Sequence, residues 1–162
     1  MSNIQSREAL LGEIRALLEK GGNDNASMQA VLEKLLEAFA CPVGTIHALD
    51  AQSGMLKLRA RRGIPDIILD KVMMIEIGKG MAGIAAERMQ PVQVCNLQTD
   101  VSGVAKPGAK ETRMEGSISV PMILNGKLRG TLGVAKPIPY DYSDEESATL
   151  MQAGAVIASY IQ

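Results

Sequence analysis

The sequence predicts an α+β domain in which helices from the two ends of the chain cover a mainly antiparallel sheet. Apolar residues recur at helical spacing near both ends, whereas in the central segments they alternate with polar residues at a period of two. Short turn sequences connect the alternating segments as hairpins, which form antiparallel pairs. The 162 residues fit one domain spanning 1–162, because a domain typically holds about 100–200 residues.

The first part of the chain predicts two helices. Residues 2–20 place leucines and isoleucines on one broad stripe, and Gly21 and Gly22 follow as a stop signal. Residues 26–40 repeat the helical spacing and are followed by Pro42, which does not continue a helix. Three polar residues are candidates for the N-cap of this second helix: Asp24, Asn25 and Ser27.

Strands follow in the middle of the chain. Residues 43–50 and 55–62 alternate in polarity around a short polar loop, which predicts a hairpin. Residues 66–71 predict one helical turn, residues 72–77 a third strand, and residues 81–89 a short helix.

A second hairpin is predicted near the end of the chain. Residues 91–96 form a fourth strand, and a polar segment at 96–116 with little periodicity follows as a long loop. The strands at 117–124 and 127–135 then meet at an Asn-Gly pair, which is the strongest short hairpin signal.

The last helix begins at Ser143. Ser143 and Glu146 have the spacing of a capping box, and apolar residues continue at helical spacing to the end of the chain. Asp144 and Glu145 fall in the first turn, where carboxylates interact favourably with the helix dipole. Together with Asp141 they form an acidic run that the capping box explains without a metal ion.

Composition excludes several classes of function. The 17 basic and 18 acidic residues give a formal net charge of −1, whereas nucleic-acid binders typically carry a basic excess. The few aromatic residues, one Phe, three Tyr and no Trp, do not provide a platform on which bases stack. One histidine and two cysteines are too few for a structural zinc site. We therefore expect no nucleic-acid partner and no metal, with only a carboxylate site for magnesium or calcium left open.

The expected compartment is the cytoplasm. The first ten residues contain Arg7 and Glu8 and no apolar core of a signal peptide. No window approaches 18 consecutive apolar residues, so we expect no membrane partner. Two cysteines far apart in the sequence, Cys41 and Cys95, fit a reducing compartment better than a disulfide framework.

A glycine motif lies between the third strand and the helix at 81–89. Gly78, Gly80 and Gly83 match the G-x-G-x-x-G pattern of dinucleotide-binding folds. The following helix is short, however, and the neighbouring strands are predicted as antiparallel hairpins rather than as parallel units. We therefore expect these glycines to form a sharp turn that presents the amides of a helix N-terminus to an anionic or polar ligand.

This succession of motifs resembles a GAF domain. The resemblance is carried by residues 75–100, which include the glycine motif, by the hairpin at 117–134, and by residues 142–146 with the helix that follows. It covers residues 5–162 and is similar above all to GAF domains of bacterial phosphotransferase-system enzymes and enhancer-binding regulators. The resemblance implies a six-stranded antiparallel sheet, with terminal helices on one face and a small-molecule pocket under loops on the other.

The family implies many ligands, and most of its cofactor-binding branches do not fit this sequence. The Asn-Lys-Phe-Asp-Glu signature of cyclic-nucleotide binders is absent. Bilin attachment needs a cysteine with aromatic packing, and haem would find only His47 as an imidazole ligand. We expect no cofactor, and we assign the mid-strand His47 a hydrogen-bonded packing or surface role.

One branch of the family is enzymatic, the free methionine-(R)-sulfoxide reductases. The resemblance implies cysteines in the glycine loop and in the loop before the hairpin, but this sequence has Met81 and Ala82 in the first loop and no cysteine at 97–116. A thiolate and its resolving partner are therefore missing where that chemistry needs them. We expect Cys95 to be a buried structural thiol and Cys41 to be structural, and we predict no catalytic residues.

The predicted binding site uses the small side chains on one face of the last hairpin. Ile118, Val120, Leu132 and Val134 take the opposite face and suit packing against the terminal helices. Small polar residues facing a mobile loop and a helix start can bind a modest polar ligand, although loop side chains could fill the same space. The predicted contacts, with Arg113 as the charged one, are Gly80, Met81, Ala82, Gly83, Arg113, Ser117, Ser119 and Thr131.

Three functional hypotheses follow. The first is a non-enzymatic sensory or regulatory module that binds a small polar or anionic ligand and signals through its terminal helices. The second is a structural dimerisation module without a ligand, and the third, disfavoured by the missing cysteines, is a sulfoxide reductase. We also expect a homodimer through the terminal helices, because the apolar stripe of residues 2–20 is wider than one sheet face requires.

Overall fold

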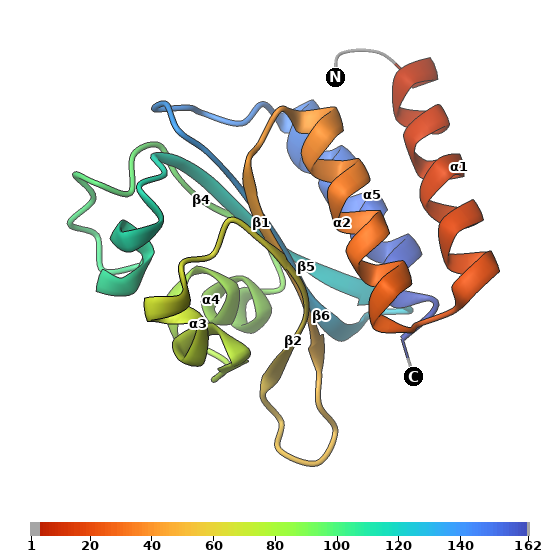
Figure 1. The fold of residues 1–162 in the computed structure, drawn as a ribbon, viewed down its shortest axis with the longest axis horizontal. Helices are drawn as coiled ribbons and strands as arrows, with labels where there is room; N and C mark the ends of the chain where they lie inside the picture. Colours follow the sequence, from red (N-terminus) through yellow and green to blue (C-terminus); the bar gives the residue numbers. More distant parts are fainter. Residues whose placement is uncertain (1–3, 162) are drawn as a thin grey trace.

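A computed structural model describes residues 4–161 of the chain, with five α-helices, one 3₁₀ helix and six strands in this part (Figure 1). No helix in residues 4–161 combines the length and the apolar character needed to span a membrane. In chain order the elements are α1 (Ile4–Gly21), α2 (Asn25–Phe39), β1 (Val43–Leu49), β2 (Leu56–Arg62), α3 (Asp66–Met73), β3 (Met74–Ile75), α4 (Gly80–Arg88), β4 (Val92–Val94), η1 (Pro107–Thr112), β5 (Gly116–Leu124), β6 (Lys127–Lys136) and α5 (Asp144–Ala158).

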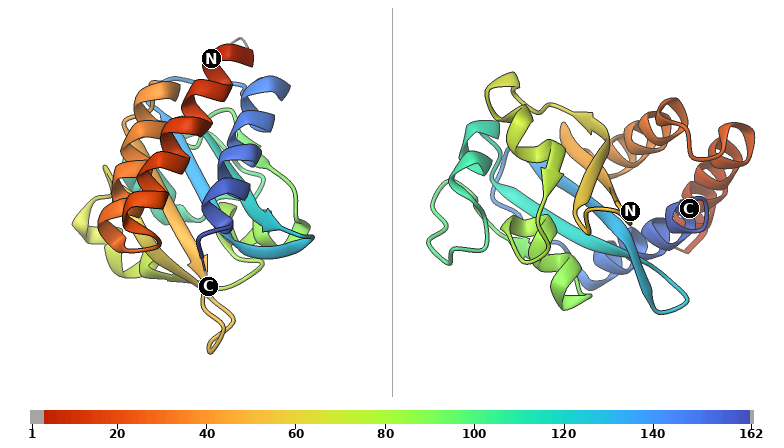
Figure 2. Two further views of the ribbon diagram at one scale, coloured as in Figure 1. Left: turned by 90° about the vertical axis from the view of Figure 1, so that its right-hand side faces the viewer. Right: turned by 90° about the horizontal axis from the view of Figure 1, so that it is seen from below.

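The six strands form one sheet in the order β3-β2-β1-β6-β5-β4, and all neighbouring pairs are antiparallel. β1 and β6, which are far apart in the sequence, lie side by side at the centre. Helices α1, α2 and α5 cover one face, while α3, α4 and η1 lie on the other (Figures 1 and 2). The predicted α+β class and antiparallel sheet are confirmed.

The core lies between the sheet and the terminal helices. The four apolar residues of the last hairpin, Ile118, Val120, Leu132 and Val134, are buried in it, as their alternation predicted. α1 packs against α2 and α5 as the outermost helix of this layer (Figure 2). Its apolar residues belong to the same core: Leu10, Leu11, Ile14 and Leu18. Most of the apolar stripe from which we expected a homodimer is therefore buried within a single chain.

Local signals set the ends of several elements as predicted. The Asp24 carboxylate accepts a hydrogen bond from the Ser27 main-chain amide at 2.7 Å and caps α2. Ser143 and Glu146 form the capping box of α5. Asn125 and Gly126, with φ values of 53° and 76°, turn the β5–β6 hairpin in the left-handed region that a type I′ turn requires.

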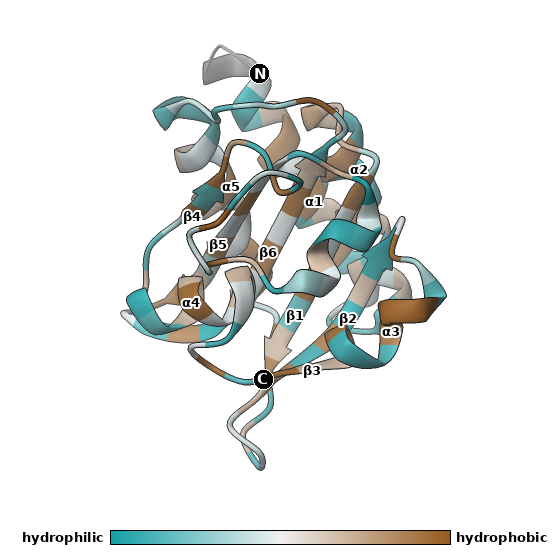
Figure 3. Ribbon diagram, turned by 90° about the vertical axis from the view of Figure 1, so that its left-hand side faces the viewer, coloured by the Kyte–Doolittle hydropathy of each residue, from teal (hydrophilic) through white to brown (hydrophobic). Residues whose placement is uncertain are grey.

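The middle of the chain differs from the prediction. α3 continues to Met73, and only Met74–Ile75 of the strand expected at 72–77 is paired. Ile68 and Val72, four residues apart, both line a cavity under the helix, which favours another helical turn over a strand. α3 also has an apolar outer side, where Ile67 is 76% exposed (Figure 3). The expected loop at 96–116 contains the 3₁₀ helix η1.

Candidate functional site

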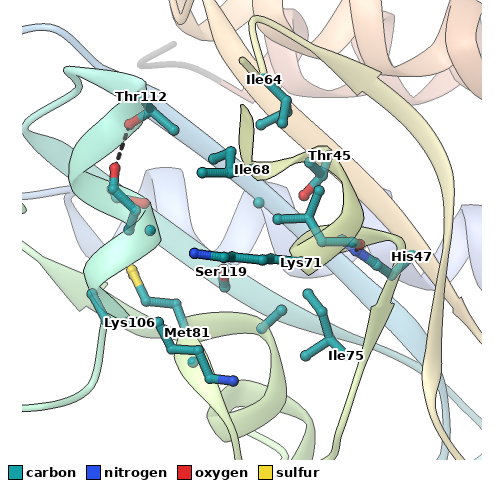
Figure 4. Close-up of a pocket in the computed structure, with 18 of the residues that line it drawn as sticks. Thr45, His47, Ile64, Ile68, Lys71, Ile75, Met81, Lys106, Thr112 and Ser119 are labelled. Atoms are coloured by element: carbon teal, nitrogen blue, oxygen red, sulfur yellow. Dashed lines mark hydrogen bonds between the residues drawn. The ribbon is translucent and has the colours of Figure 1, made fainter. Parts of the chain in front are cut away.

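A cavity of about 530 Å³ lies between the sheet and the elements on its second face. Its floor is formed by β1, β5 and β6, and its roof by α3, the start of α4 and the segment 105–112 (Figure 4). The lining is mainly apolar, with contributions such as Ile64, Ile68 and Met81. A cavity of this size and character is typical of small-molecule sites.

Small polar side chains form a row across the floor. Ser119 on β5 pairs with Gly133 on β6, and Gly133 pairs with Thr45 on β1. A Cβ atom at position 133 would lie 3.1 Å from Ser119 Oγ and 3.6 Å from Thr45 Oγ1, so the glycine leaves space over both hydroxyls. Ser117 lines the cavity on the same face. Within residues 4–161 none of these three hydroxyls has a hydrogen-bond partner, so they are available to a ligand.

The charged residues of the cavity are predominantly basic. Lys71, Lys79 and Lys106 line it, against the single carboxylate of Glu76. The ion pairs of the described chain, Lys34 with Glu13 and Arg62 with Glu33, involve none of these four. Lys71 extends across the cavity from α3, with its amine directed away from His47 (Figure 4). The field in the cavity therefore favours an anion.

The glycine motif brings the N-terminus of α4 to the cavity. Gly78 and Gly80 have φ values of 90° and 68°, which allow the sharp turn before the helix. At Gly83 a Cβ atom would lie closer to the Glu76 carbonyl oxygen than van der Waals contact permits, so the helix and the turn pack main chain to main chain. Lys79 is the N-cap and its side chain makes no capping bond. The first-turn amides of α4 can therefore interact with an anionic group.

His47 lies on the floor of the cavity and is only 1% exposed. Its Nε2 is 2.7 Å from the Val72 main-chain oxygen. Because a carbonyl oxygen only accepts, Nε2 carries the hydrogen atom of this bond. Burial lowers the pKa of His47, although the bond to Val72 opposes this effect. The predicted hydrogen-bonded packing role is confirmed, but its position at the cavity was not predicted.

Five of the eight predicted contact residues line the cavity: Gly80, Met81, Ala82, Ser117 and Ser119. Gly83 instead packs under the turn, and Thr131 is buried beside His47 on the neighbouring strand. Arg113 is exposed at the C-cap of η1, in the left-handed region at φ 62°, and does not line the cavity. The expectation that Arg113 supplies the charged contact is therefore not met by the geometry.

Sequence patterns did not predict that the three lysines, Thr45 and His47 line the cavity. Alternation in β1 does place Val43, Thr45 and His47 on one face. This alternation predicts cavity-lining residues only if β1 is known to lie beside β6. That pairing joins segments far apart in the sequence. Lys71 lies on the short helix α3, and Lys79 and Lys106 lie just before α4 and η1. In such short or irregular segments the sequence pattern does not predict the direction of a side chain.

Neither cysteine lines the cavity. Cys41 is buried, with its Sγ 3.8 Å from the Tyr142 hydroxyl oxygen, and burial raises the pKa of its thiol. Cys95 is exposed, so the expectation of a buried thiol is wrong. The reason is that the pairing of β4 ends at Val94, which leaves Cys95 beyond the end of a short edge strand. A free thiol is thus absent from the place where a ligand would lie.

Within residues 4–161 no group of three or more histidine, cysteine or carboxylate side chains is placed to hold a metal ion. Within the acidic run near the start of α5, Glu146 has the capping role that its spacing predicted. The Glu146 carboxylate accepts hydrogen bonds from the Ser143 main-chain amide at 2.9 Å and from the Tyr140 hydroxyl.

Solved structures with the same fold include a GAF domain, a putative sensor protein and an enzyme. The GAF domain of a phosphoenolpyruvate-protein phosphotransferase from Coxiella burnetii is similar with a TM-score of 0.82 and 21% identity, covering 98% of this chain and 94% of that chain. A putative GAF sensor protein from Burkholderia vietnamiensis has a TM-score of 0.76 and 20% identity, covering 99% and 96%. The free methionine-R-sulfoxide reductase from Neisseria meningitidis, solved with its substrate, has a TM-score of 0.75 and 16% identity, covering 99% and 92%.

A comparison with curated protein sequences gave no match. The sequence model of the GAF domain matches residues 25–162, which contain the whole sheet, the cavity and two of the three helices that cover the opposite face. The observed architecture agrees with the one that the sequence motifs implied, and the GAF domain model matches most of the chain. The chain therefore belongs to the GAF domain family.

Proposed function

We propose that this GAF domain is a non-enzymatic sensory or regulatory module that binds a small anionic molecule in the cavity between the sheet and the α3, α4 and η1 elements. The observation that carries this proposal is the charge of the lining. Lys71, Lys79 and Lys106 are unpaired within the described chain and surround a mainly apolar space with one carboxylate, Glu76. The three lysines are exposed, so solvent and salt partly screen their attraction for an anion in the cavity.

The neutral groups around the cavity support the same ligand class. The first-turn amides of α4, at Gly80, Met81 and Ala82, have no capping side chain. The Ser117 and Ser119 hydroxyls can donate hydrogen bonds from the floor. Hydrogen bonds to a charged group contribute roughly 1.5–3 kcal/mol each, more than bonds between neutral groups. The site therefore suits a carboxylate or phosphate joined to an apolar body.

The route to the terminal helices runs through β6. Ala135 lines the cavity, and the next residue, Lys136, donates a hydrogen bond from its amine to the Phe39 carbonyl oxygen at the end of α2. The same amine lies 4.8 Å from the centre of the Tyr140 ring, and Tyr140 contacts Glu146 in the first turn of α5. A ligand that binds one arrangement of β6 more tightly than another would shift α2 and α5 with it.

The cysteine positions favour a binding module over an enzyme of the sulfoxide reductase type. Met81 and Ala82 occupy the part of the glycine loop that lines the cavity, and Cys41 and Cys95 lie elsewhere. Reduction of a sulfoxide by a thiol needs a thiolate that reaches the substrate sulfur, followed by a disulfide with a second thiol. The fold alone does not decide between binding and catalysis, since one fold hosts both.

The test is an NMR titration of the chain with phosphate, pyrophosphate and a series of mono- and dicarboxylic acids. We expect at least one anion to shift the amide signals of Gly80, Met81 and Ala82. Lys71→Gln should weaken that anion by about tenfold or more. Lys34→Gln is the matched control, because Lys34 pairs with Glu13 in the helix layer at 3.3 Å, away from the cavity. Binding that the two variants weaken equally, or no binding by any anion, would contradict the proposal.

A further inference from the structure

Three buried polar side-chain atoms on the central strands have no hydrogen-bond partner within the described residues, and two of them belong to His47, which lines the cavity, and Thr131, which does not. His47 on β1 and Thr131 on β6 are directly paired across the sheet, and each is 1% exposed. Within residues 4–161 neither His47 Nδ1 nor Thr131 Oγ1 has a hydrogen-bond partner. Directly opposite residues on antiparallel strands have Cβ atoms about 5 Å apart. The His47 and Thr131 side chains are therefore neighbours on the same face of the sheet, and we call them the polar patch.

The chemistry of this patch follows from the bond that His47 already makes. Nε2 donates to the Val72 carbonyl oxygen at 2.7 Å. A neutral imidazole has one donor and one acceptor, so Nδ1 is the acceptor. The factors that act on the pKa of His47 are burial, which lowers it, and the Val72 hydrogen bond, with no contribution from a neighbouring carboxylate. The ring is therefore neutral near pH 7, and Nδ1 needs a partner that donates.

His47 lies away from Lys106 and from the amine of Lys71 in the cavity (Figure 4). In Figure 4 His47 is on one side, Lys106 and Met81 are on the other, and the amine of Lys71 points away from His47. The cationic groups attract the acidic group of a ligand to the second end, so the opposite end of the same ligand reaches His47. A second charge there would be costly, because the surroundings are buried and offer no counter-ion.

We propose that the ligand is a small organic acid that carries a neutral hydrogen-bond donor, a hydroxyl or an amide N–H, at the end opposite its acidic group, and that this donor binds His47 Nδ1. The inference rests on the proposed function, because it requires an anion in the cavity. His47 lines the cavity and is the residue that contacts this donor, whereas Thr131 lies beside it on β6 without lining the cavity and acts through His47. His47 thus determines specificity, with Thr131 as a positioning residue, while the lysines supply attraction.

The test uses two pairs of acids that differ only in a terminal hydroxyl or methyl group: 4-hydroxyphenylacetate with 4-methylphenylacetate, and 5-hydroxypentanoate with hexanoate. Dissociation constants are measured by NMR titration. In at least one pair we expect the hydroxyl acid to bind about tenfold or more tightly, because the methyl analogue leaves buried polar groups unpaired. His47→Gln should reduce this preference, since the Gln amide nitrogen can replace Nε2 at Val72 while the Gln acceptor, Oε1, is not held at the position of Nδ1.

Thr131→Val is the second variant and should reduce the preference while it keeps the shape of the side chain. Thr149→Val is its matched control. Thr149 is also 1% exposed but lies on α5, where its hydroxyl donates to the Glu145 carbonyl oxygen at 2.9 Å. Thr149→Val should leave the preference unchanged.

The outcomes separate the two proposals. Equal binding of all four acids, or a preference that persists in both His47→Gln and Thr131→Val, would overturn the role of His47 and leave the anion site standing. Failure of all four acids to bind would count against both. Circular dichroism and thermal unfolding establish that each variant is folded, and Thr131→Val tests the inference if His47→Gln does not fold.

Discussion

The Tyr140 hydroxyl donates its hydrogen bond to the Glu146 carboxylate, whose two oxygens lie 2.9 and 2.8 Å from the phenolic oxygen. Glu146 also accepts from the Ser143 amide, so one carboxylate connects the segment after β6 to the first turn of α5. Burial by itself would raise the pKa of Glu146, but the bonds from Ser143 and Tyr140 outweigh it and lower that pKa.

A carboxyl with a lowered pKa in the folded state stabilises the fold above its unfolded pKa, and this stabilisation is lost as the pH falls through the folded value. We therefore expect the free energy of unfolding to fall below about pH 4.5, near the ordinary pKa of Glu. Urea unfolding of the parent and Glu146→Gln at pH 6 and pH 3 measures this. The gap between the two proteins should be smaller at pH 3, and a constant gap would contradict the assignment.

His47 is the only histidine in the chain, which isolates its effect on stability near neutral pH. Its pKa is lowered by burial, so between the folded and unfolded values the unfolded state binds more protons. Stability should therefore decrease as the pH falls from about 7 towards 5. Urea unfolding across this range should show that slope in the parent and a flatter one in His47→Gln. Parallel curves would show that His47 is not responsible.

Gly83 should not tolerate a side chain. A methyl group there would overlap the Glu76 carbonyl oxygen, which belongs to the main chain and cannot rotate away. We expect Gly83→Ala to destabilise the fold by about 1–3 kcal/mol. In Gly12→Ala, on α1, the new methyl group has no neighbour within 4 Å, and the better helix propensity should stabilise by up to about 1 kcal/mol. Similar effects of the two substitutions would contradict the packing at Gly83.

Cys95→Ser should change the free energy of unfolding by no more than about 0.5 kcal/mol, because the side chain is exposed. Cys41→Ser should cost more, since that thiol is buried near Tyr142. Neither variant should alter the turnover of free methionine sulfoxide with a thiol reductant, because we expect none in the parent. Turnover by the parent that is lost in either variant would revive the enzymatic hypothesis.

The expected homodimer remains a prediction for sedimentation. Leu10, Leu11 and Leu18 of α1 are buried within one chain and Leu17 is partly buried, so we expect a dimer to use the groove between α1 and α5 that includes Arg15, Gln152 and Tyr160. Analytical ultracentrifugation at tens of micromolar should show a dimer, and Ala155→Arg in this groove should convert it to a monomer. A parent that sediments as a monomer would rule this interface out.

The features that sequence patterns predicted depend on residues close together in the chain. The capping box at Ser143, the Asn125-Gly126 turn and the apolar face of the last hairpin each follow from local spacing. The cavity required information of longer range. β1 pairs with β6 across 82 residues at Ala48 and Gly130 and across 92 residues at Val43 and Ala135. No local pattern encodes a contact of this range, and the pairing brings Thr45 and His47 to the floor.

Arg113 and Lys71 show that local sequence patterns also failed to predict the direction of single side chains. The position of Arg113 just before β5 suggested that it could reach the cavity, but the left-handed conformation at the end of η1 leaves it exposed. Lys71 does reach the cavity because α3 runs to Met73, longer than the single turn that its sequence predicted. In both cases the course of the backbone in a short irregular segment decides the direction of the side chain.

Gly133 makes the size of the site adjustable at one position of a central strand. The nearest atoms to a methyl group there are the Ser119 and Thr45 hydroxyl oxygens and the Ile118 carbonyl oxygen at 3.6 Å, so no main-chain atom blocks it. At Gly130 on the same strand, by contrast, a methyl group would collide with the main-chain oxygen of His47. A change at position 133 alone could therefore reduce the volume of the cavity without rebuilding the sheet.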